Sequence, residues 1–557
     1  MVDSRRPGDV MRLKRMGASH HNRLSFMRSL VRRMAGERWG FERLIFDVDA
    51  EGYGTSVYAA RTPTRTYSLV AFTRELEPGQ RSDRVIAEAW DATFNLFDGV
   101  PTEADLVRLA ENTPRQESGR FTTKELSVAR ANKSLRAFKH VVDALAVGRQ
   151  PDIDFLSDVG YLMRTTAVYG SGKYGCADNE KIAQRPEMRG PFQVEMLAVY
   201  LIRWFTIDLV EHVARSTGGR RAVALHPAIK RFLGIGNSTG LGMAPFLVKH
   251  PELINNWVVA RETALMRVRN LPSVTSQQCD ILYKLTNQIH RYLEEWVVED
   301  KVQACRITKL RSEMVNFEDH LLNTDILSQE HPWNALYLLA ESAYSLEGQE
   351  LITSLILEPH GDLIDDLADT MCADRAEVFD PVMTVAEVLN LLENNYCWAL
   401  KRDYKTSEEQ QYFWYYSEDK LEPRFSNRYC GLGVEWEMPL AIGRDVAALE
   451  AELMNADPHT SIAAFLIRRP EFRHIVRRVQ TTARFPYGEI YDSLISSDVR
   501  PIDLLRFKLA FFGASKFDPK SDLWTRITMF QGAPMPHELC DAEGDGWAFP
   551  VKPEVLA

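Results

Sequence analysis

FQVEMLAVYLIRWFTIDLVEHV, residues 192–213, is the most apolar stretch of the chain and the one on which the fold depends most. A segment of this length could cross a membrane, but Glu195, Arg203 and Asp208 interrupt it, and such charges are costly in lipid. We therefore interpret it as a buried core helix and expect no membrane partner. A charge on a buried helix needs a partner or a wet cavity. Arg203 is accordingly expected either to form an ion pair, with Glu195 nearby, or to line a pocket.

The composition is that of a globular protein. Of 557 residues, 45% are hydrophobic and 26% are charged, which excludes a disordered or fibrous chain. At roughly 150 residues per domain, the length suggests about three packed units. The seven cysteines include no CxxC pair, so neither a disulfide framework nor a structural zinc site is expected. Reduced thiols and the lack of an apolar signal segment favour a cytoplasmic location.

Charge is distributed unevenly along the chain. Residues 1–50 hold eleven Lys and Arg against six Asp and Glu, a net charge of +5. The whole chain has a net charge of −10, so residues 51–557 carry −15. Residues 341–400 hold thirteen acidic residues and one base, Arg375. Each run can be a solvated helix face, with the basic N-terminus lying against the acidic block of the same or a neighbouring chain. A nucleic-acid arm is the alternative, but the overall acidity argues against a nucleic-acid partner.

Strand signals are concentrated near the N-terminus. An amphipathic helix is expected over residues 19–39. The short runs that follow are rich in β-branched and aromatic residues and are separated by turn residues, which predicts an antiparallel meander; they are Arg43–Val48, Thr55–Arg61 and Thr66–Thr73. Ser82 and Asp83 are expected to open a helix that runs to Phe97 and covers one face of this sheet.

The remainder of the chain has helical periodicity nearly everywhere from residue 121 onward. The expected fold is therefore mainly α-helical, with a small N-terminal α+β unit that combines the antiparallel meander with helices. The polar stretch at 111–120 is the best candidate linker. Three domains are expected: a small α+β domain with a basic N-terminal helix at 1–115, a helical core domain with glycine-rich loops at 121–345, and a helical C-terminal domain with an aromatic and Arg-rich irregular segment at 346–557.

A glycine-rich segment, GIGNSTGLGMAP at residues 234–245, is the strongest candidate binding site. Glycine lets the backbone come close to a ligand, and amides at the start of a following helix attract an anion. Asn237, Ser238, Thr239 and Gly240 would cradle a phosphate or carboxylate, and Arg261 could supply a full charge. The alternative is a helix cap with a close helix crossing.

A second glycine-rich segment, YGSGKYG at residues 169–175, carries possible acid–base groups. It lacks the spacing of a phosphate-binding P-loop, so we do not expect nucleotide binding of that kind. Tyr169 and Lys173 could act as general acid or base if burial shifts their pKa values. The alternative is a surface turn with a solvated lysine.

Aromatic and arginine side chains gather between Tyr412 and Pro439, outside any clear helical pattern. Arg424 could bind a carboxylate in a two-pronged geometry, with the aromatic residues as the wall of a pocket. A subunit interface collects the same residue types, so a homodimer is the alternative.

These observations favour a cytosolic enzyme acting on a small anionic metabolite, most simply by a lyase-type elimination with general acid–base chemistry. The expected catalytic residues are Lys173, Tyr169 and Ser238. The expected substrate-binding residues are Asn237, Thr239, Gly240, Arg203, Arg261 and Arg424. No set of metal ligands is complete enough to predict a metal site, and no motif identifies a cofactor. The alternative is a non-catalytic binding or assembly protein that uses residues 412–437 as an interface.

Overall fold

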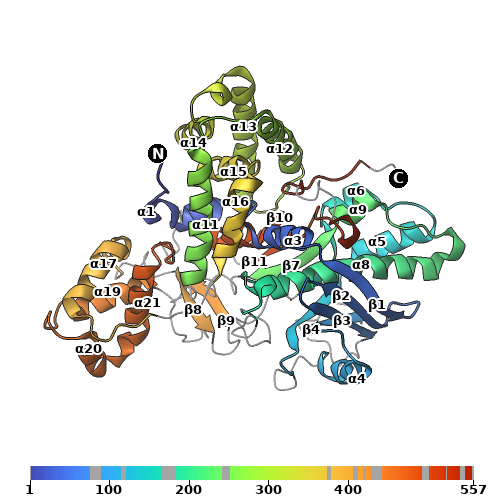
Figure 1. Cartoon of the computed structure of the whole chain (residues 1–557), viewed down its shortest axis with the longest axis horizontal. Coiled ribbons are helices and arrows are strands. Elements are labelled where there is room, and N and C mark those ends of the chain that lie inside the picture. The colour runs from blue at the N-terminus through green and yellow to red at the C-terminus, as the bar shows by residue number, and fades with distance from the viewer. Residues whose placement is uncertain are drawn as a thin grey trace.

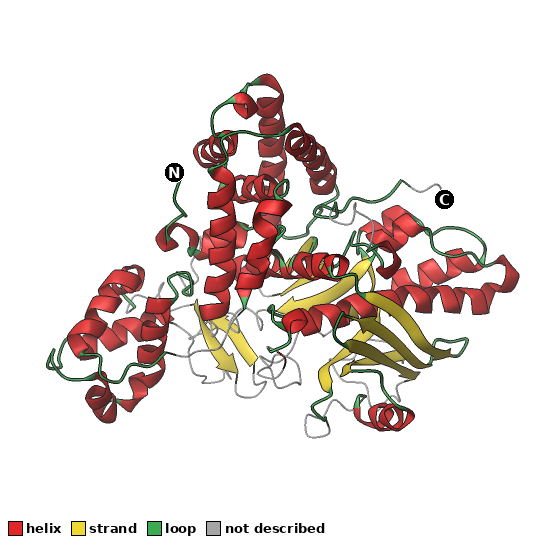
Figure 2. Ribbon diagram, viewed as in Figure 1, coloured by secondary structure: helices red, strands yellow, loops and turns green. Residues whose placement is uncertain are grey.

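A computed structural model gives the fold, which is a mostly helical α+β arrangement around one large sheet (Figure 2). The structure describes residues 2–75, 90–114, 121–165, 182, 184–240, 251–372, 378–404, 412–417, 422–427, 442–491, 501–521, 524–539 and 546–554.

The large sheet has nine strands in the order β1-β2-β3-β4-β5-β6-β7-β11-β10. All neighbours are antiparallel except β6 and β7, which are parallel. The strands are β1 (Gly40–Val48), β2 (Gly54–Arg61), β3 (Thr66–Glu75), β4 (Trp90–Asp98), β5 (Glu125–Lys133), β6 (Tyr161–Thr165), β7 (Gly234–Gly240), β10 (Lys516–Ser521) and β11 (Trp524–Met529).

The predicted meander is confirmed as β1, β2 and β3, which pair in sequence order. It is not a small separate unit, because the sheet continues through β4 and β5. The helix predicted from Ser82 to Phe97 is wrong, since Trp90–Asp98 is a strand. In β4 the buried Phe94 and Leu96 alternate with residues of the other face, a period of two that the helical interpretation overlooked. The same error applies to Glu125–Lys133, which was expected to be helical.

Strands β2, β3 and β4 bury residues on both faces of the sheet. Tyr58, Leu69 and Phe94 belong to the main core. Their neighbours along each strand point to the opposite face. There Val57, Val70 and Phe97 form a second, smaller cluster with Leu109. Leu109 comes from helix α4 (Glu103–Asn112), whose first turn is closed by a capping box between Thr102 and Asp105. Helix α4 therefore covers the face of the sheet that is turned away from the main core (Figure 1).

Helix α8 (Gln193–Gly218) confirms the predicted buried core helix. It packs across β2 to β7 and against α5 (Leu135–Ala146), so its apolar residues are enclosed on most sides. No described helix, α8 included, has both the length and the apolar composition needed to cross a membrane. Helices α6 (Ile153–Ser157) and α9 (Pro227–Phe232) lie at the same end of the molecule (Figure 1).

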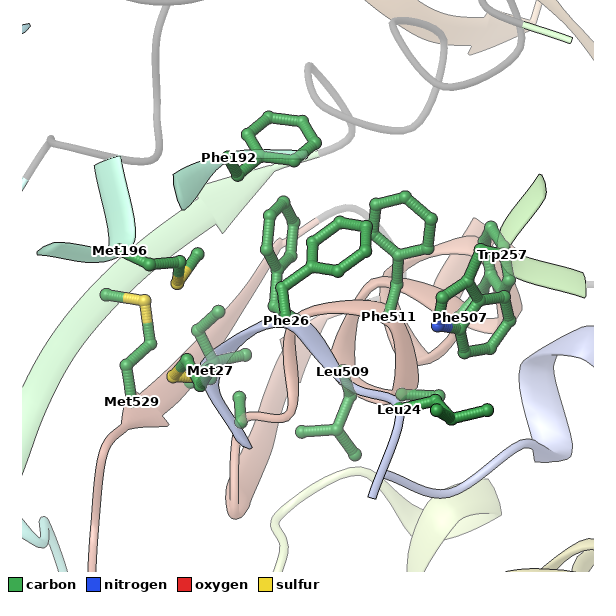
Figure 3. Close-up of a cluster of buried hydrophobic side chains, with 14 of the residues drawn as sticks. Leu24, Phe26, Met27, Phe192, Met196, Trp257, Phe507, Leu509, Phe511 and Met529 are labelled. Atoms are coloured by element: carbon green, nitrogen blue, oxygen red, sulfur yellow. The ribbon is translucent and has the colours of Figure 1, made fainter. Parts of the chain in front are cut away.

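The end of the chain completes the sheet that its beginning starts. Strand β11 pairs with β7 along its whole length, from Trp524 beside Gly240 to Met529 beside Ile235. The sheet thus joins strands from all three ranges that were expected to form separate domains. Helix α22 (Pro501–Phe512) precedes β10 and brings Phe511 against Phe26 of α3 (Phe26–Gly36), with ring centroids 4.3 Å apart. Figure 3 shows this cluster, with Trp257 at one side and Phe192 above.

The remaining helices form two groups in Figure 1. One group stands beside the sheet and comprises α11 (Pro251–Arg269), α12 (Ser276–Glu294), α13 (Lys301–Asn323), α14 (Pro332–Ala343), α15 (Leu346–Leu357) and α16 (Gly361–Ile364). The other lies away from the sheet and comprises α17 (Val385–Leu400), α19 (Ile442–Leu453), α20 (Ile462–Arg468) and α21 (Arg473–Arg484). Strands β8 (Tyr412–Ser417) and β9 (Glu422–Asn427) form a separate hairpin, in a segment that was expected to be irregular.

The basic N-terminal segment lies against the acidic block of the same chain, as one of the two interpretations predicted. It contains α1 (Pro7–Val10), α2 (Leu13–Ala18) and α3, so the helix expected over 19–39 is shorter than predicted. Its arginines form ion pairs with residues 350–369: Arg5 and Arg15 with Glu350, Arg28 with Glu358, Arg23 and Arg32 with Asp365, and Arg33 with Asp369. The two charge runs are therefore largely internal contacts.

Glu350 on α15 is the centre of this network. Its side chain is fully buried, and its carboxylate accepts hydrogen bonds from Arg5 at 2.9 Å and Arg15 at 2.8 Å and also from Arg261. Burial alone would raise the pKa of this carboxyl, but Arg261, Arg5 and Arg15 outweigh it and hold the pKa well below the ordinary value of 4.5. Three arginines from distant parts of the chain are thus gathered on one carboxylate.

Replacing this carboxylate should be strongly destabilising at neutral pH. We expect Glu350→Gln to lower the free energy of unfolding by about 3 kcal/mol or more, because three arginines lose their common counter-charge. A carboxyl with a depressed native pKa stabilises the fold above its unfolded pKa, and that contribution disappears as pH falls through the native pKa. The difference in unfolding free energy between Glu350→Gln and wild type should therefore become smaller below about pH 4.5. Denaturant unfolding at a series of pH values measures this difference.

Glu393→Gln is the matched control, because Glu393 is an exposed residue of α17. Its unfolding free energy should stay within about 0.5 kcal/mol of wild type. Equal stabilities of the Glu350→Gln and Glu393→Gln proteins at pH 7 would contradict the central role of Glu350.

Candidate functional site

Strands β6 and β7 form a strand–helix–strand unit with α8 between them. They are parallel neighbours, with Tyr161 beside Gly234 and Arg164 beside Gly236. This is the only parallel pair among the described strands. The C-terminal ends of the two strands, Thr165 and Gly240, therefore lie at the same edge of the sheet. In sheets of this kind, ligands bind outside the carboxyl ends of parallel strands.

Asn237 links the two strands at that edge. Its side-chain amide Nδ2 donates to the Thr165 carbonyl at 2.8 Å, and the residue is 1% exposed. The Oδ1 atom is buried and has no hydrogen-bond partner, which is a costly arrangement for a carbonyl oxygen. Asn237 thus lies at the expected edge, but half of its amide group serves to hold β6 against β7.

The start of α8 has no side-chain cap, and of its first amides that of Gln193 donates to the Gly190 carbonyl at 3.4 Å. Its N-cap residue is Phe192, which has left-handed backbone angles with φ of 56°, and no side chain caps the helix. The first amides of a helix have no partner within the helix and carry partial positive charge, which favours an anion. Both Figure 1 and Figure 3 place the start of α8, at Phe192, beside the end of β7.

A small cavity opens at this helix end, and we call it the α8 pocket. Its volume is about 20 Å³, room for about one water molecule or one oxygen atom of a larger ligand. The polar residues around it are Ser29, Arg33, Arg189, Gln193, Asp369 and Cys372. Ser29 Oγ and Gln193 Oε1 are buried without a hydrogen-bond partner. The Ser29 hydroxyl can donate to a bound group, whereas Gln193 Oε1 is an amide oxygen and can only accept.

The two arginines of the α8 pocket differ in their surroundings. Arg33 pairs with Asp369 and also donates to the Pro186 carbonyl. Arg189 is exposed and forms no ion pair with any described residue. A cation without a counter-ion at the mouth of a pocket, together with a helix N-terminus that has no side-chain cap, makes the pocket suited to a negatively charged group.

Arg203 forms no ion pair with any described residue, so the ion pair expected for it, with Glu195 nearby, is not found. It is 1% exposed, and all three guanidinium nitrogens donate to backbone carbonyls. The acceptors are Lys230, Arg231, Leu233, Ala533 and Pro534. Burial without a carboxylate lowers the Arg203 pKa to about 10. Arg203 therefore closes the C-terminal end of α9 and fastens the loop that follows β11, so we do not assign it to substrate binding.

Arg261 is also a structural residue. It is buried on α11 and pairs with Glu350 and with Glu262, at 3.8 Å from the latter. Both carboxylates also bind Arg5. The guanidinium of Arg261 is thus committed to the network that holds the N-terminal segment, and its substrate-binding assignment is not supported by its surroundings.

The predicted glycine cradle is in part a strand. Gly234–Gly240 is β7, between β6 and β11, and residues 241–245 lie outside the described residues. A Cβ atom at Gly236 would lie 2.6 Å from Cζ of Tyr161, and one at Gly234 would collide with the Met529 carbonyl. These glycines are required by close packing within the sheet, which the sequence alone could not distinguish from a ligand-binding loop.

The other predicted site residues are only partly described. Tyr169 and Lys173 lie outside the described residues. Ser238, Thr239 and Gly240 are placed as backbone of β7, and Arg424 as backbone of β9; their side chains are outside the description. Among the described residues, no group of three or more possible ligands is arranged to hold a metal ion.

Sequence reasoning missed Ser29, Arg189 and Gln193. Gln193, in the first turn of the apolar helix, is only 5% exposed. The signals that existed were local: Gly190 and Pro191 interrupt the chain just before the apolar stretch, and Arg189 precedes them. The pocket itself is made by α3, the start of α8 and residues 368–372, and no pattern within one segment indicates such a meeting.

No family model, curated protein or solved structure matches the chain.

Adding a single methyl group at Gly236 tests the packing interpretation of the glycines. We expect Gly236→Ala to lower the free energy of unfolding by about 1 to 3 kcal/mol, because the added carbon overlaps the Tyr161 ring. Gly8→Ala is the control, since a Cβ atom there has open space around it. Denaturant unfolding curves in which both variants match wild type would contradict this interpretation.

Proposed function

We propose that this chain is a cytoplasmic enzyme that binds a small carboxylate or phosphate metabolite at the α8 pocket. The observation that carries the proposal is the N-terminus of α8, without a side-chain cap, at a cavity lined by Ser29, whose hydroxyl has no partner, and by Arg189, which forms no ion pair with any described residue. One anionic oxygen would enter the pocket, where α8 amides and the Ser29 hydroxyl can donate to it. Arg189 would bind the rest of the anionic group from the mouth.

The position of the strand ends supports placing the chemistry nearby. The segment with Tyr169 and Lys173 begins directly after Thr165, the last residue of β6, and Ser238 belongs to β7. The segment after β6 and the end of β7 that contains Ser238 are therefore at the edge of the sheet where α8 begins. We propose that Lys173 or Tyr169 removes a proton from the bound metabolite and that Ser238 assists proton transfer. The simplest reaction of this type is an elimination, in which the anionic group stays bound while a leaving group departs.

Binding can be tested by thermal shift with inorganic phosphate, succinate and malate. A ligand at about ten times its Kd adds roughly 1.4 kcal/mol to the stability of the native state, so the Tm should rise. Arg189→Gln should raise the Kd of the anion that binds about tenfold, because the charge at the mouth is lost. The Tm shift at the same anion concentration should therefore be smaller than in wild type. Arg221→Gln, at an exposed site in the 3-10 helix η4 (Gly219–Arg221), should leave the response unchanged. An identical response of wild type and Arg189→Gln would count against the pocket.

Catalysis can be tested with malate, the one of the three anions that has a leaving group, because loss of a C3 proton and of the C2 hydroxyl forms a carbon–carbon double bond and releases water. Lys173→Ala and Ser238→Ala should each lower its turnover, followed by NMR, by about 10² to 10⁴-fold, the usual contribution of an acid–base group. The Tm and the far-UV circular dichroism of both variants should match wild type. Lys139→Ala is the control, since Lys139 is an exposed residue of α5 paired with Asp143. Wild-type turnover in both variants would remove the enzymatic part of the proposal.

A second candidate function is a non-catalytic assembly protein that uses the β8–β9 hairpin. One observation favours it: residues Tyr412–Tyr416 are five consecutive aromatic residues in β8, which pairs only with β9 in the described structure. Alternation along a strand distributes such residues over both faces of a two-stranded sheet, which is not stable by itself in water. If this alternative holds, the Arg189→Gln substitution should not change the Tm shift that an anion produces.

A further inference from the structure

The α8 pocket contains a hydroxyl and an amide oxygen that are both buried without a partner. Ser29 is 9% exposed and Gln193 is 5% exposed, and neither Oγ of Ser29 nor Oε1 of Gln193 forms a hydrogen bond. Both residues line one cavity of about 20 Å³, so a single atom inside it meets both side chains. Because unsatisfied buried polar groups cost free energy, these two groups indicate what kind of atom the pocket takes.

The turn before α8 fixes the Gln193 side chain. Gly190 lines the same cavity, and a Cβ atom there would lie 2.9 Å from Nε2 and 3.1 Å from Cγ of Gln193. Glycine at this position therefore leaves room for the glutamine. Of the two amide atoms, Nε2 is the one nearer to Gly190, and Oε1 is farther away. An amide oxygen has lone pairs and no hydrogen, so it requires a donor from any group that it meets.

The charges of the pocket lining are matched inside and unmatched at the mouth. Arg33 and Asp369 both line the cavity and pair with each other. An ionised oxygen inside would meet the Asp369 carboxylate and Oε1 of Gln193, both of which repel a negative charge. Arg189 is exposed and forms no ion pair with any described residue. The unmatched positive charge is therefore available to an anion at the mouth, while the interior suits an uncharged oxygen.

We propose that the oxygen that enters the α8 pocket belongs to a hydroxyl group, which lies directly beside the anionic group of the ligand. A hydroxyl oxygen accepts a hydrogen bond from Ser29, and its own hydrogen is donated to Oε1 of Gln193, so both buried groups are satisfied together. Arg189 binds the neighbouring anionic group. The ligand class is a 2-hydroxycarboxylate or a protonated phosphate, because each carries a hydroxyl next to anionic oxygens.

This inference rests on the function proposed above and makes it more specific. It replaces the anionic oxygen inside the pocket with a hydroxyl oxygen, and the role of Arg189 stays the same. Gln193 becomes a specificity-determining residue, because its Oε1 distinguishes an oxygen with a hydrogen from one without. In malate, the hydroxyl held by Ser29 and Gln193 is also the group that leaves in the elimination proposed above.

The test compares pairs of anions in which only one member has the hydroxyl, by isothermal titration calorimetry on the full-length protein. The pairs are malate with succinate, lactate with propionate, and phosphate with sulfate at neutral pH, where phosphate carries a proton and sulfate does not. The hydroxylated member should bind at least about tenfold more tightly, because its partner leaves two buried groups unsatisfied. A preference in the first two pairs indicates a 2-hydroxycarboxylate, and one in the third pair alone indicates a phosphate.

Two variants assign this preference to the side chains. Gln193→Met keeps a side chain of similar length without the acceptor, and Ser29→Ala removes the hydroxyl. In each variant the affinity for the hydroxylated anion should fall about tenfold, to the level of its partner, whereas the affinity for the partner should not decrease. A merely structural effect would weaken both members of a pair alike. Arg189→Gln should do so, because it removes the charge that both members need.

Matched controls carry the same substitutions at buried sites outside the α8 pocket. Gln303 on α13 is 2% exposed and its Nε2 has no partner, so Gln303→Met is the control for Gln193→Met. Ser56 on β2 is 1% exposed and its Oγ has no partner, so Ser56→Ala is the control for Ser29→Ala. Both controls should keep the wild-type preference. The Tm of each variant reports its fold, and the comparison of pairs in wild type needs no variant.

Equal affinities within every pair in wild type would overturn the inference. If that binding is lost in Arg189→Gln, the proposed function stands and only the hydroxyl assignment fails; if it persists, both fail. A hydroxyl preference that remains in folded Gln193→Met and Ser29→Ala would also overturn the inference, because it would arise at another site. Absence of binding for all six anions would remove the inference together with the proposed function.

Discussion

A single buried carboxylate, Glu350, holds the N-terminal segment to the helical half of the molecule. Arg5 and Arg15 come from that segment, Arg261 comes from α11 and Glu350 itself belongs to α15, so three separate stretches of chain meet at one side chain. Such a group is tolerated inside a protein only when its charge is fully matched. The arrangement therefore requires that all three stretches be in place together, and the packing of α3 against α8 and α22 depends on it.

The position of α3 in turn shapes the candidate site. Helix α3 supplies Phe26 to the aromatic cluster and Ser29 and Arg33 to the α8 pocket. The opposite wall of the pocket, near Asp369, belongs to the acidic block that the N-terminal arginines bind. The charge runs that first suggested a nucleic-acid arm or a solvated face thus build one side of a pocket. The cations that stay exposed, such as Arg473 and Arg484, are in a different part of the molecule.

Local patterns predicted the elements whose stability is local. The meander β1–β3 has short turns and clear alternation, and α8 contains the most apolar stretch of the chain, so both were found. Strands β4 and β5 were missed because their period of two was overlooked. The far side of the sheet was missed because β7 and β11 pair across nearly 290 residues of sequence, and no window of the chain records that contact. Arg203 was misassigned for the same reason. The acceptors of Arg203 are backbone carbonyls. Because every residue type has a backbone carbonyl, the sequence does not indicate which residues Arg203 binds.

The pairing of β11 with β7 has a consequence for synthesis of the protein on the ribosome. Until residues 524–529 leave the exit tunnel, the edge of β7 lacks its native neighbour. More than 280 residues are made between the two strands, during which an unpaired strand edge is open to other chains. In nascent protein the sheet therefore stays incomplete until residues 524–529 can pair with β7, and truncated chains that stop before β11 carry that open edge permanently.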